Sequence, residues 1–107
     1  KRDNSKEYPK IHPTQKPVNL LKRLIEIFTD EGDVVIDPVA GSGSTLRACA
    51  ELNRSCYGFE IKKDFVKQAK EQMLSNIKRQ STIFDADIRG EINGRRRIQT
   101  KIWRVKR

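Results

Sequence analysis

The feature that most constrains the fold is a short β-branched run followed by a turn of small residues. Residues 33–37, Asp-Val-Val-Ile-Asp, have the composition of a strand, and Pro38 ends it. Such a run is typical of a strand buried on both faces of a parallel sheet. The next segment, residues 40–45, contains Gly41 and Gly43, which allow unusual backbone angles and a close ligand approach. The pattern predicts a strand, a turn and a helix that begins at the ligand-binding edge of a sheet.

Helical and strand patterns alternate on both sides of this turn. From Pro17, which suits the first position of a helix, apolar residues recur at helical spacing. This stripe consists of Val18, Leu21, Leu24, Ile25 and Phe28, and the helix is expected to close between Thr29 and Gly32. A second helix is predicted over residues 45–52 and a second strand over residues 56–61. A third helix follows, with Asp64 in its first turn, where its charge favours the helix dipole.

The order helix, strand, helix, strand, helix predicts an α/β fold with a parallel sheet and flanking helices. The expected inner positions are Leu46, Cys49, Ala50 and Leu52 on the second helix and Val66, Ala69, Met73 and Ile77 on the third. Cys49 and Cys56 are expected to be small buried hydrophobes. With His12 as the sole histidine, no metal site is predicted.

Charge and periodicity divide the chain into an extended arm (1–13), an α/β core (14–77) and a basic extension (78–107). The net charge of +9 is uneven, at +3 in residues 1–17, −1 in 18–77 and +7 in 78–107. Within the extension, residues 82–84 could form a short strand, and Asn93-Gly94 could turn a hairpin between Ile92 and the alternating residues 98–102. A disordered arm is the alternative. Basic flanks suit a polyanion such as DNA, and a solubilising tail is the alternative.

An acidic residue points to the kind of ligand. Glu60 ends the second strand 19 residues after Gly41, near the spacing at which an acid binds ribose hydroxyls. A third glycine and a P-loop lysine are both missing, which disfavours a pyrophosphate cofactor and a dinucleotide oxidoreductase. Asp37 would repel phosphate but tolerate a sulfonium. A nucleoside such as S-adenosylmethionine fits best. The alternative is that the two glycines and the acid only form a turn and bind no ligand.

Three motifs resemble the permuted, beta-type DNA amino-methyltransferases, which methylate N6 of adenine or N4 of cytosine. They are His-Pro-Thr-Gln-Lys-Pro at 12–17, Asp-Pro-Val-Ala-Gly-Ser-Gly-Ser-Thr at 37–45 and Gly-Phe-Glu-Ile at 58–61. The resemblance covers about residues 8–77 and implies a partial, Rossmann-like methyltransferase fold. It implies cofactor binding by His12, Thr14, Lys16, Pro17, Asp37, Pro38, Ala40, Gly41, Gly43, Ser44, Thr45, Glu60 and Ile61.

The resemblance also assigns roles within this set. The loop would wrap the methionine part of the cofactor, Glu60 would hold the ribose, and Ile61 would pack on the adenine. Lys16 suits the cofactor's carboxylate. Val39 stands where the family usually has an aromatic residue.

The family's catalytic motif, a Pro-Pro-aromatic segment, does not occur in this chain, so no catalytic residue is predicted. Since that motif precedes residue 12 in the permuted group, and Met73 is the only methionine, we expect the chain to be the C-terminal cofactor part of a longer enzyme. That enzyme would be a site-specific DNA methyltransferase of restriction–modification type, with N6 of adenine favoured. The chain alone would be inactive. The alternative is a non-catalytic nucleic-acid-binding or regulatory module with a relic pocket.

No apolar run approaches a membrane span, and residues 1–10 are polar. The expected location is the cytoplasm of a bacterial, archaeal or phage-infected cell. The expected partners are double-stranded DNA and the missing N-terminal catalytic part. An exposed sheet edge also predicts self-association of the isolated chain.

Overall fold

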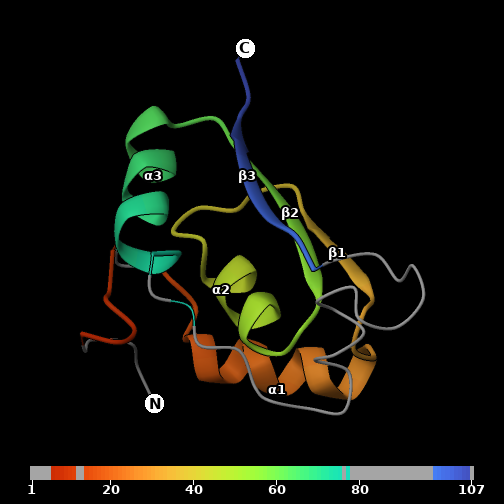
Figure 1. Cartoon of the computed structure of the whole chain (residues 1–107). Coiled ribbons are helices and arrows are strands. Elements are labelled where there is room, and N and C mark those ends of the chain that lie inside the picture. Colours follow the sequence, from red (N-terminus) through yellow and green to blue (C-terminus); the bar gives the residue numbers. More distant parts are fainter. Residues whose placement is uncertain (1–5, 12–13, 76, 78–97, 107) are drawn as a thin grey trace.

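A computed structural model of the chain describes residues 6–11, 14–75, 77 and 98–106. These residues form one parallel sheet in the order β1 (Val34–Asp37), β2 (Ser55–Glu60) and β3 (Thr100–Arg104). The helices are α1 (Val18–Phe28), α2 (Ser44–Glu51) and α3 (Lys63–Gln68), and α3 runs on into a π-helical turn, η1 (Ala69–Met73). Figure 1 shows α2 and α3 on one side of the sheet and α1 beneath α2. The predicted parallel α/β fold is confirmed.

The core lies between the sheet and α2. A Cβ on Gly58 would approach the Leu46 side chain to 2.6 Å and the Ala40 Cβ to 3.0 Å. Glycine at this point of β2 therefore lets α2 pack directly on the strand. The predicted inner residues Leu46, Cys49, Ala50 and Leu52 are all buried, as are Val66, Ala69 and Met73 on the next helix.

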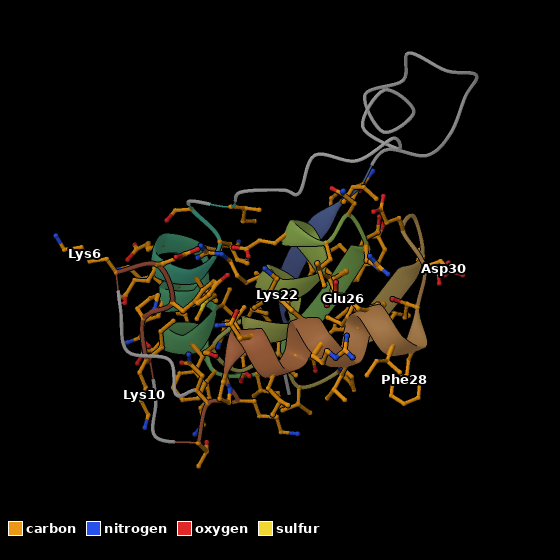
Figure 2. The ribbon with its side chains drawn as sticks, turned by 90° about the horizontal axis from the view of Figure 1, so that it is seen from below. Lys6, Lys10, Lys22, Glu26, Phe28 and Asp30 are labelled. Carbon is orange, nitrogen blue, oxygen red and sulfur yellow. The ribbon has the colours of Figure 1, made fainter. Side chains whose placement is uncertain are left out.

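The first helix differs from its prediction in two respects. It begins at Val18, and Pro17 is the N-cap with an extended backbone. Of its apolar stripe, Val18 and Ile25 are buried, but Leu24 is 43% and Phe28 78% exposed. The helix packs on α2, which covers only part of the stripe, and Figure 2 shows Phe28 pointing away from the protein body. The helix ends as expected, with the Thr29 hydroxyl donating to the Ile25 carbonyl at 2.6 Å.

The first strand was expected to be buried on both faces, and this is wrong. Val34 is 44% and Ile36 64% exposed, whereas Val35 packs against the core. The helices cover the face that carries Val35, and no described helix lies on the opposite face. An apolar run specifies a buried strand only if both faces find partners.

On β2 and β3, the uncovered face of the sheet carries aromatic side chains. Trp103 of β3 stacks on Phe59 and Tyr57 of β2, with ring centroids 5.3 Å and 5.7 Å away. Residues 100–104, which the prediction placed in the second strand of a hairpin, form β3 and pair in parallel with β2. The short strand predicted at residues 82–84 lies outside the described residues. The predicted hairpin turn lies outside the described residues. The sheet thus includes residues beyond the predicted core boundary at residue 77.

Within the described ranges, no helix is both long and apolar enough to cross a membrane.

Candidate ligand-binding site

A cavity of about 630 Å³ opens at the carboxyl ends of β1 and β2. Three stretches of chain surround it: the segment before α1, the turn between β1 and α2, and the residues that follow β2. Its lining comprises Thr14, Gln15, Lys16, Leu21, Ile36, Asp37, Val39, Ala40, Gly41, Ser42, Ser44, Thr45, Glu60, Lys62 and Phe65. The parallel strands bring their carboxyl ends to one edge, which is why motifs far apart in the sequence meet there.

The glycine turn is held by main-chain bonds. Both glycines adopt left-handed conformations, with φ of 54° at Gly41 and 86° at Gly43. The Ala40 amide donates to the Phe59 carbonyl of β2, and the Gly43 amide donates to the Ala40 carbonyl, both at 2.9 Å. The hydroxyls of Ser42 and Ser44 lie 2.9 Å apart. These bonds tie the turn to β2 and close it on itself.

Glu60 joins this turn to the chain after β2. Its Oε1 accepts a hydrogen bond from the Gly41 amide and its Oε2 accepts one from the Lys62 amide, each at 2.8 Å. The residue is only 7% exposed, yet it lines the cavity. Each carboxylate oxygen has a second lone pair, so the fixed carboxylate can still accept hydrogen bonds from a ligand.

The turn offers little to a phosphate. The amides of Gly41, Gly43 and Val39 already donate to Glu60, to a carbonyl and to the Asp37 carboxylate respectively. In phosphate-binding turns such amides face the anion instead. Two carboxylates, from Asp37 and Glu60, also line the cavity. Lys16 and Lys62 balance these charges in the lining, so the occupied amides, rather than the net charge of the cavity, disfavour a pyrophosphate.

Of the residues predicted for cofactor binding, the cavity lining unites Thr14, Lys16, Asp37, Ala40, Gly41, Ser44, Thr45 and Glu60. His12 lies outside the described residues. Gly43 is buried against η1, where an added Cβ would meet the Ala69 Cβ at 3.1 Å. Pro17 and Pro38 do not belong to the lining, and nor does Ile61, which is 46% exposed.

Sequence reasoning did not find the apolar wall of the cavity. Leu21, Ile36 and Phe65 contribute to it, together with the exposed Val39. The Lys62 ammonium lies 5.1 Å from the centre of the Phe65 ring, within cation–π range. The sequence contained one indication that Phe65 lines a cavity. Phe65 lies next to the inner stripe of its helix and not within it, so its large ring needs a surface other than the core to pack against.

The cysteines play no part in the cavity. Both Cys49 and Cys56 are fully buried, as predicted, and a hydrogen bond with Cys49 together with burial raises the pKa of the Cys56 thiol. Among the described residues no cluster of His, Cys, Asp or Glu side chains could hold a metal ion.

The fold and the cavity define an incomplete α/β domain with a ligand site at the carboxyl edge of its sheet. Residues 1–71 match the DNA methylase family N6_N4_Mtase. Because this match spans more than half of the sequence, the chain belongs to that family.

Curated relatives agree with this assignment. The chain is 47% identical over 68 residues to the type II methyltransferase M.HpaI of Haemophilus parainfluenzae, covering 64% of this chain and 22% of that protein. It is 55% identical over 49 residues to M.HindIII of Haemophilus influenzae, which is 46% of this chain and 16% of that protein. The DNA adenine methyltransferase YhdJ of Escherichia coli is 45% identical over 56 residues, or 52% of this chain and 19% of YhdJ. The chain thus spans about a fifth of the length of these relatives.

A solved structure shares the fold. The crystal structure of the M1.HpyAVI–SAM complex matches 66% of this chain and 40% of that protein, with 36% sequence identity and a TM-score of 0.56.

Proposed function

We propose that this chain is the S-adenosylmethionine-binding portion of a site-specific DNA methyltransferase. Membership of the DNA methylase family supports this, as does the match to a protein crystallised with S-adenosylmethionine. The observation that carries the proposal is the buried Glu60 carboxylate, fixed by two backbone amides in the cavity wall.

The cavity fits this cofactor in size and chemistry. Its volume of about 630 Å³ falls within the usual range for small-molecule sites. Glu60 has acceptor capacity left for the two ribose hydroxyls, and Leu21, Ile36 and Phe65 supply apolar surface for the adenine. Lys16 and Asp37 provide opposite charges for the carboxylate and the ammonium of the methionine part. When bound, the cofactor supplies an activated methyl group on its sulfonium.

The parent reaction would transfer this methyl group to an exocyclic amine of a DNA base. We favour N6 of adenine, because YhdJ among the relatives is a DNA adenine methyltransferase. The chain contains no Pro-Pro-aromatic segment, so we propose that by itself it binds the cofactor without methylating DNA. A tritiated methyl-transfer assay on DNA measures this, and robust turnover by the isolated chain would contradict it.

Double-stranded DNA is the proposed polyanionic partner of the basic residues. In the described part of the basic extension, Lys101, Arg104 and Lys106 are exposed on or next to β3. Deleting residues 78–107 would remove β3 and damage the sheet. The better test of DNA binding replaces these three side chains by glutamine and follows the salt dependence of affinity.

Cofactor titration by calorimetry tests the central proposal. We expect the wild-type chain to bind S-adenosylmethionine, and Gly41→Val to abolish binding, because valine is strained at a φ of 54° and fills the cavity wall. Far-ultraviolet circular dichroism verifies that the variant is folded. If the wild-type chain binds salt-sensitively to DNA but not to the cofactor, the relic-pocket alternative is correct instead.

A further inference from the structure

The arm that precedes α1 is attached to the protein at a point outside the cavity. The Tyr8 hydroxyl donates a hydrogen bond to Oε1 of Glu51 at 2.7 Å. The Tyr8 ring also packs against the guanidinium of Arg47, whose central carbon lies 5.0 Å from the ring centre. None of these side chains lines the cavity.

Three elements hold the acceptor, Glu51, in place. Arg47 Nε donates to Oε2 at 2.7 Å from one turn earlier on α2, and Lys22 Nζ of α1 lies 3.1 Å from Oε1. Arg47 Nη1 also donates to the Met73 carbonyl of η1 at 2.8 Å. The Glu51 side chain is only 3% exposed. Tyr8 thus binds to a point fixed jointly by α1, α2 and η1.

Glu51 stays ionised in this setting. Burial by itself would raise the pKa of its carboxyl, but hydrogen bonds from Tyr8, Arg47 and Lys22 outweigh this and lower it. The bond from Tyr8 is therefore a charge-assisted one, which is stronger than a bond between neutral groups.

Within the described part of the arm, the Gln15 side chain links the segment next to this attachment to the cavity. Gln15 accepts a hydrogen bond from the Ile11 amide at 2.7 Å and donates one to the Pro9 carbonyl at 3.0 Å. Gln15 lines the cavity, together with its neighbours Thr14 and Lys16. A displacement of the arm at Tyr8 would therefore be transmitted through Gln15 to this wall.

We infer that Tyr8 is a positioning residue, whose hydrogen bond to Glu51 holds the arm where Thr14, Gln15 and Lys16 complete the cofactor cavity. The inference rests on the proposed function, because it assigns to Tyr8 a share of cofactor affinity. It identifies a contact outside the cavity that sets the strength of binding within it.

The test compares S-adenosylmethionine affinity in the full 107-residue chain and its variants by calorimetry. Tyr8→Phe keeps the ring on Arg47 but removes the hydroxyl, and we expect about tenfold weaker binding. Thermal unfolding should shift to a lower temperature, because a hydrogen bond to a buried carboxylate is lost, and circular dichroism verifies that the variant is folded at the temperature of the titration. The matched control is Tyr57→Phe on the outer face of the sheet, with affinity within about twofold of the wild type.

A second control distinguishes the effect of the arm from the effect of the charged cluster around Glu51. Lys22→Gln removes a partner of the same Glu51 oxygen without touching the arm, so cofactor affinity should remain near the wild-type value. Figure 2 shows Lys22 on α1, and Lys10 at the margin of the molecule on the arm. An equal loss of affinity in Lys22→Gln and Tyr8→Phe would overturn the inference, because the arm would then have no special role.

Tryptic cleavage after the exposed Lys10 reports on the arm directly. Cofactor should slow this cleavage in the wild type, and cleavage should be faster in Tyr8→Phe, because coupling between two sites is reciprocal. A Tyr8→Phe chain that binds as tightly as the wild type would overturn the inference alone. A wild-type chain that fails to bind would overturn the proposed function together with it.

Discussion

Replacing Glu60 by glutamine removes an acceptor from the turn that builds the cavity. The wild-type carboxylate accepts from the amides of Gly41 and Lys62, one on each oxygen, at 2.8 Å. Glutamine has one carbonyl oxygen and one NH₂ group, so one amide must face a donor and lose its partner. The residue is 7% exposed, and solvent cannot easily replace the bond.

The expected loss of stability follows from the loss of this one hydrogen bond. A hydrogen bond to a charged group contributes about 1.5–3 kcal/mol, so we expect Glu60→Gln to lower the free energy of unfolding by a similar amount. The substitution also weakens the acceptors proposed for the ribose hydroxyls. Together with a loosened turn, this predicts cofactor binding weaker by about 10- to 100-fold.

Two assays report the two effects separately. Urea unfolding measures the stability change, and calorimetric titration with S-adenosylmethionine measures the affinity. Glu26→Gln makes the same chemical change on an exposed side chain of α1, labelled in Figure 2, and should change neither quantity. If Glu60→Gln bound the cofactor within twofold of the wild type, our assignment of the carboxylate to the ligand would be refuted.

Four further predictions concern stability and self-association. Gly43→Ala should lower the free energy of unfolding by about 2–4 kcal/mol, from left-handed strain and the contact with Ala69. Gly32→Ala, with a φ of 89° but nothing within 4 Å of its Cβ, should cost only about 1–2 kcal/mol in the same urea experiment. The pKa of Glu51 is lowered on folding, so its contribution to stability is present above the ordinary pKa of 4.5 and is lost as the pH falls through the folded-state value. The thermal stability difference between wild type and Glu51→Gln should therefore be larger at neutral pH than in strong acid, and a constant difference would contradict this reasoning. Finally, Phe28→Ser combined with Ile36→Thr should reduce self-association, measured by light scattering, because these two large apolar side chains are 78% and 64% exposed.

Local patterns were enough to predict the parallel sheet and the helices that flank it. Gly-rich turns and β-branched runs restrict the backbone within a few residues, so the turn at 40–45 and the helix after it follow from composition alone. The same reasoning put Asp37, Gly41 and Glu60 near one ligand, and all three line the cavity. These residues meet because parallel strands bring their carboxyl ends to one edge of the sheet.

Predictions that depended on neighbours distant in the sequence were less accurate. The stripe of α1 includes Leu24 and Phe28 by spacing, but α2 is too short to cover the whole helix. Residues 100–104 have no local feature that distinguishes a parallel strand from part of a hairpin, since β2 provides their hydrogen bonds. Phe65 became a cavity residue only because α3 lies beside the turn, whereas Lys62 reaches the cavity directly from the carboxyl end of β2.

The sequence by itself determined which features lie at the carboxyl ends of the strands: a tight glycine turn, an acid at the end of the next strand, and no phosphate-binding motif. Tertiary structure alone decided what that acid does, namely accept the two amides that fix the turn around the cavity. It also decided that Tyr8 anchors the arm through a buried carboxylate on α2. Backbone preferences act over a few residues and can be inferred from the chain, whereas hydrogen bonds between distant residues exist only once packing has brought the two groups together.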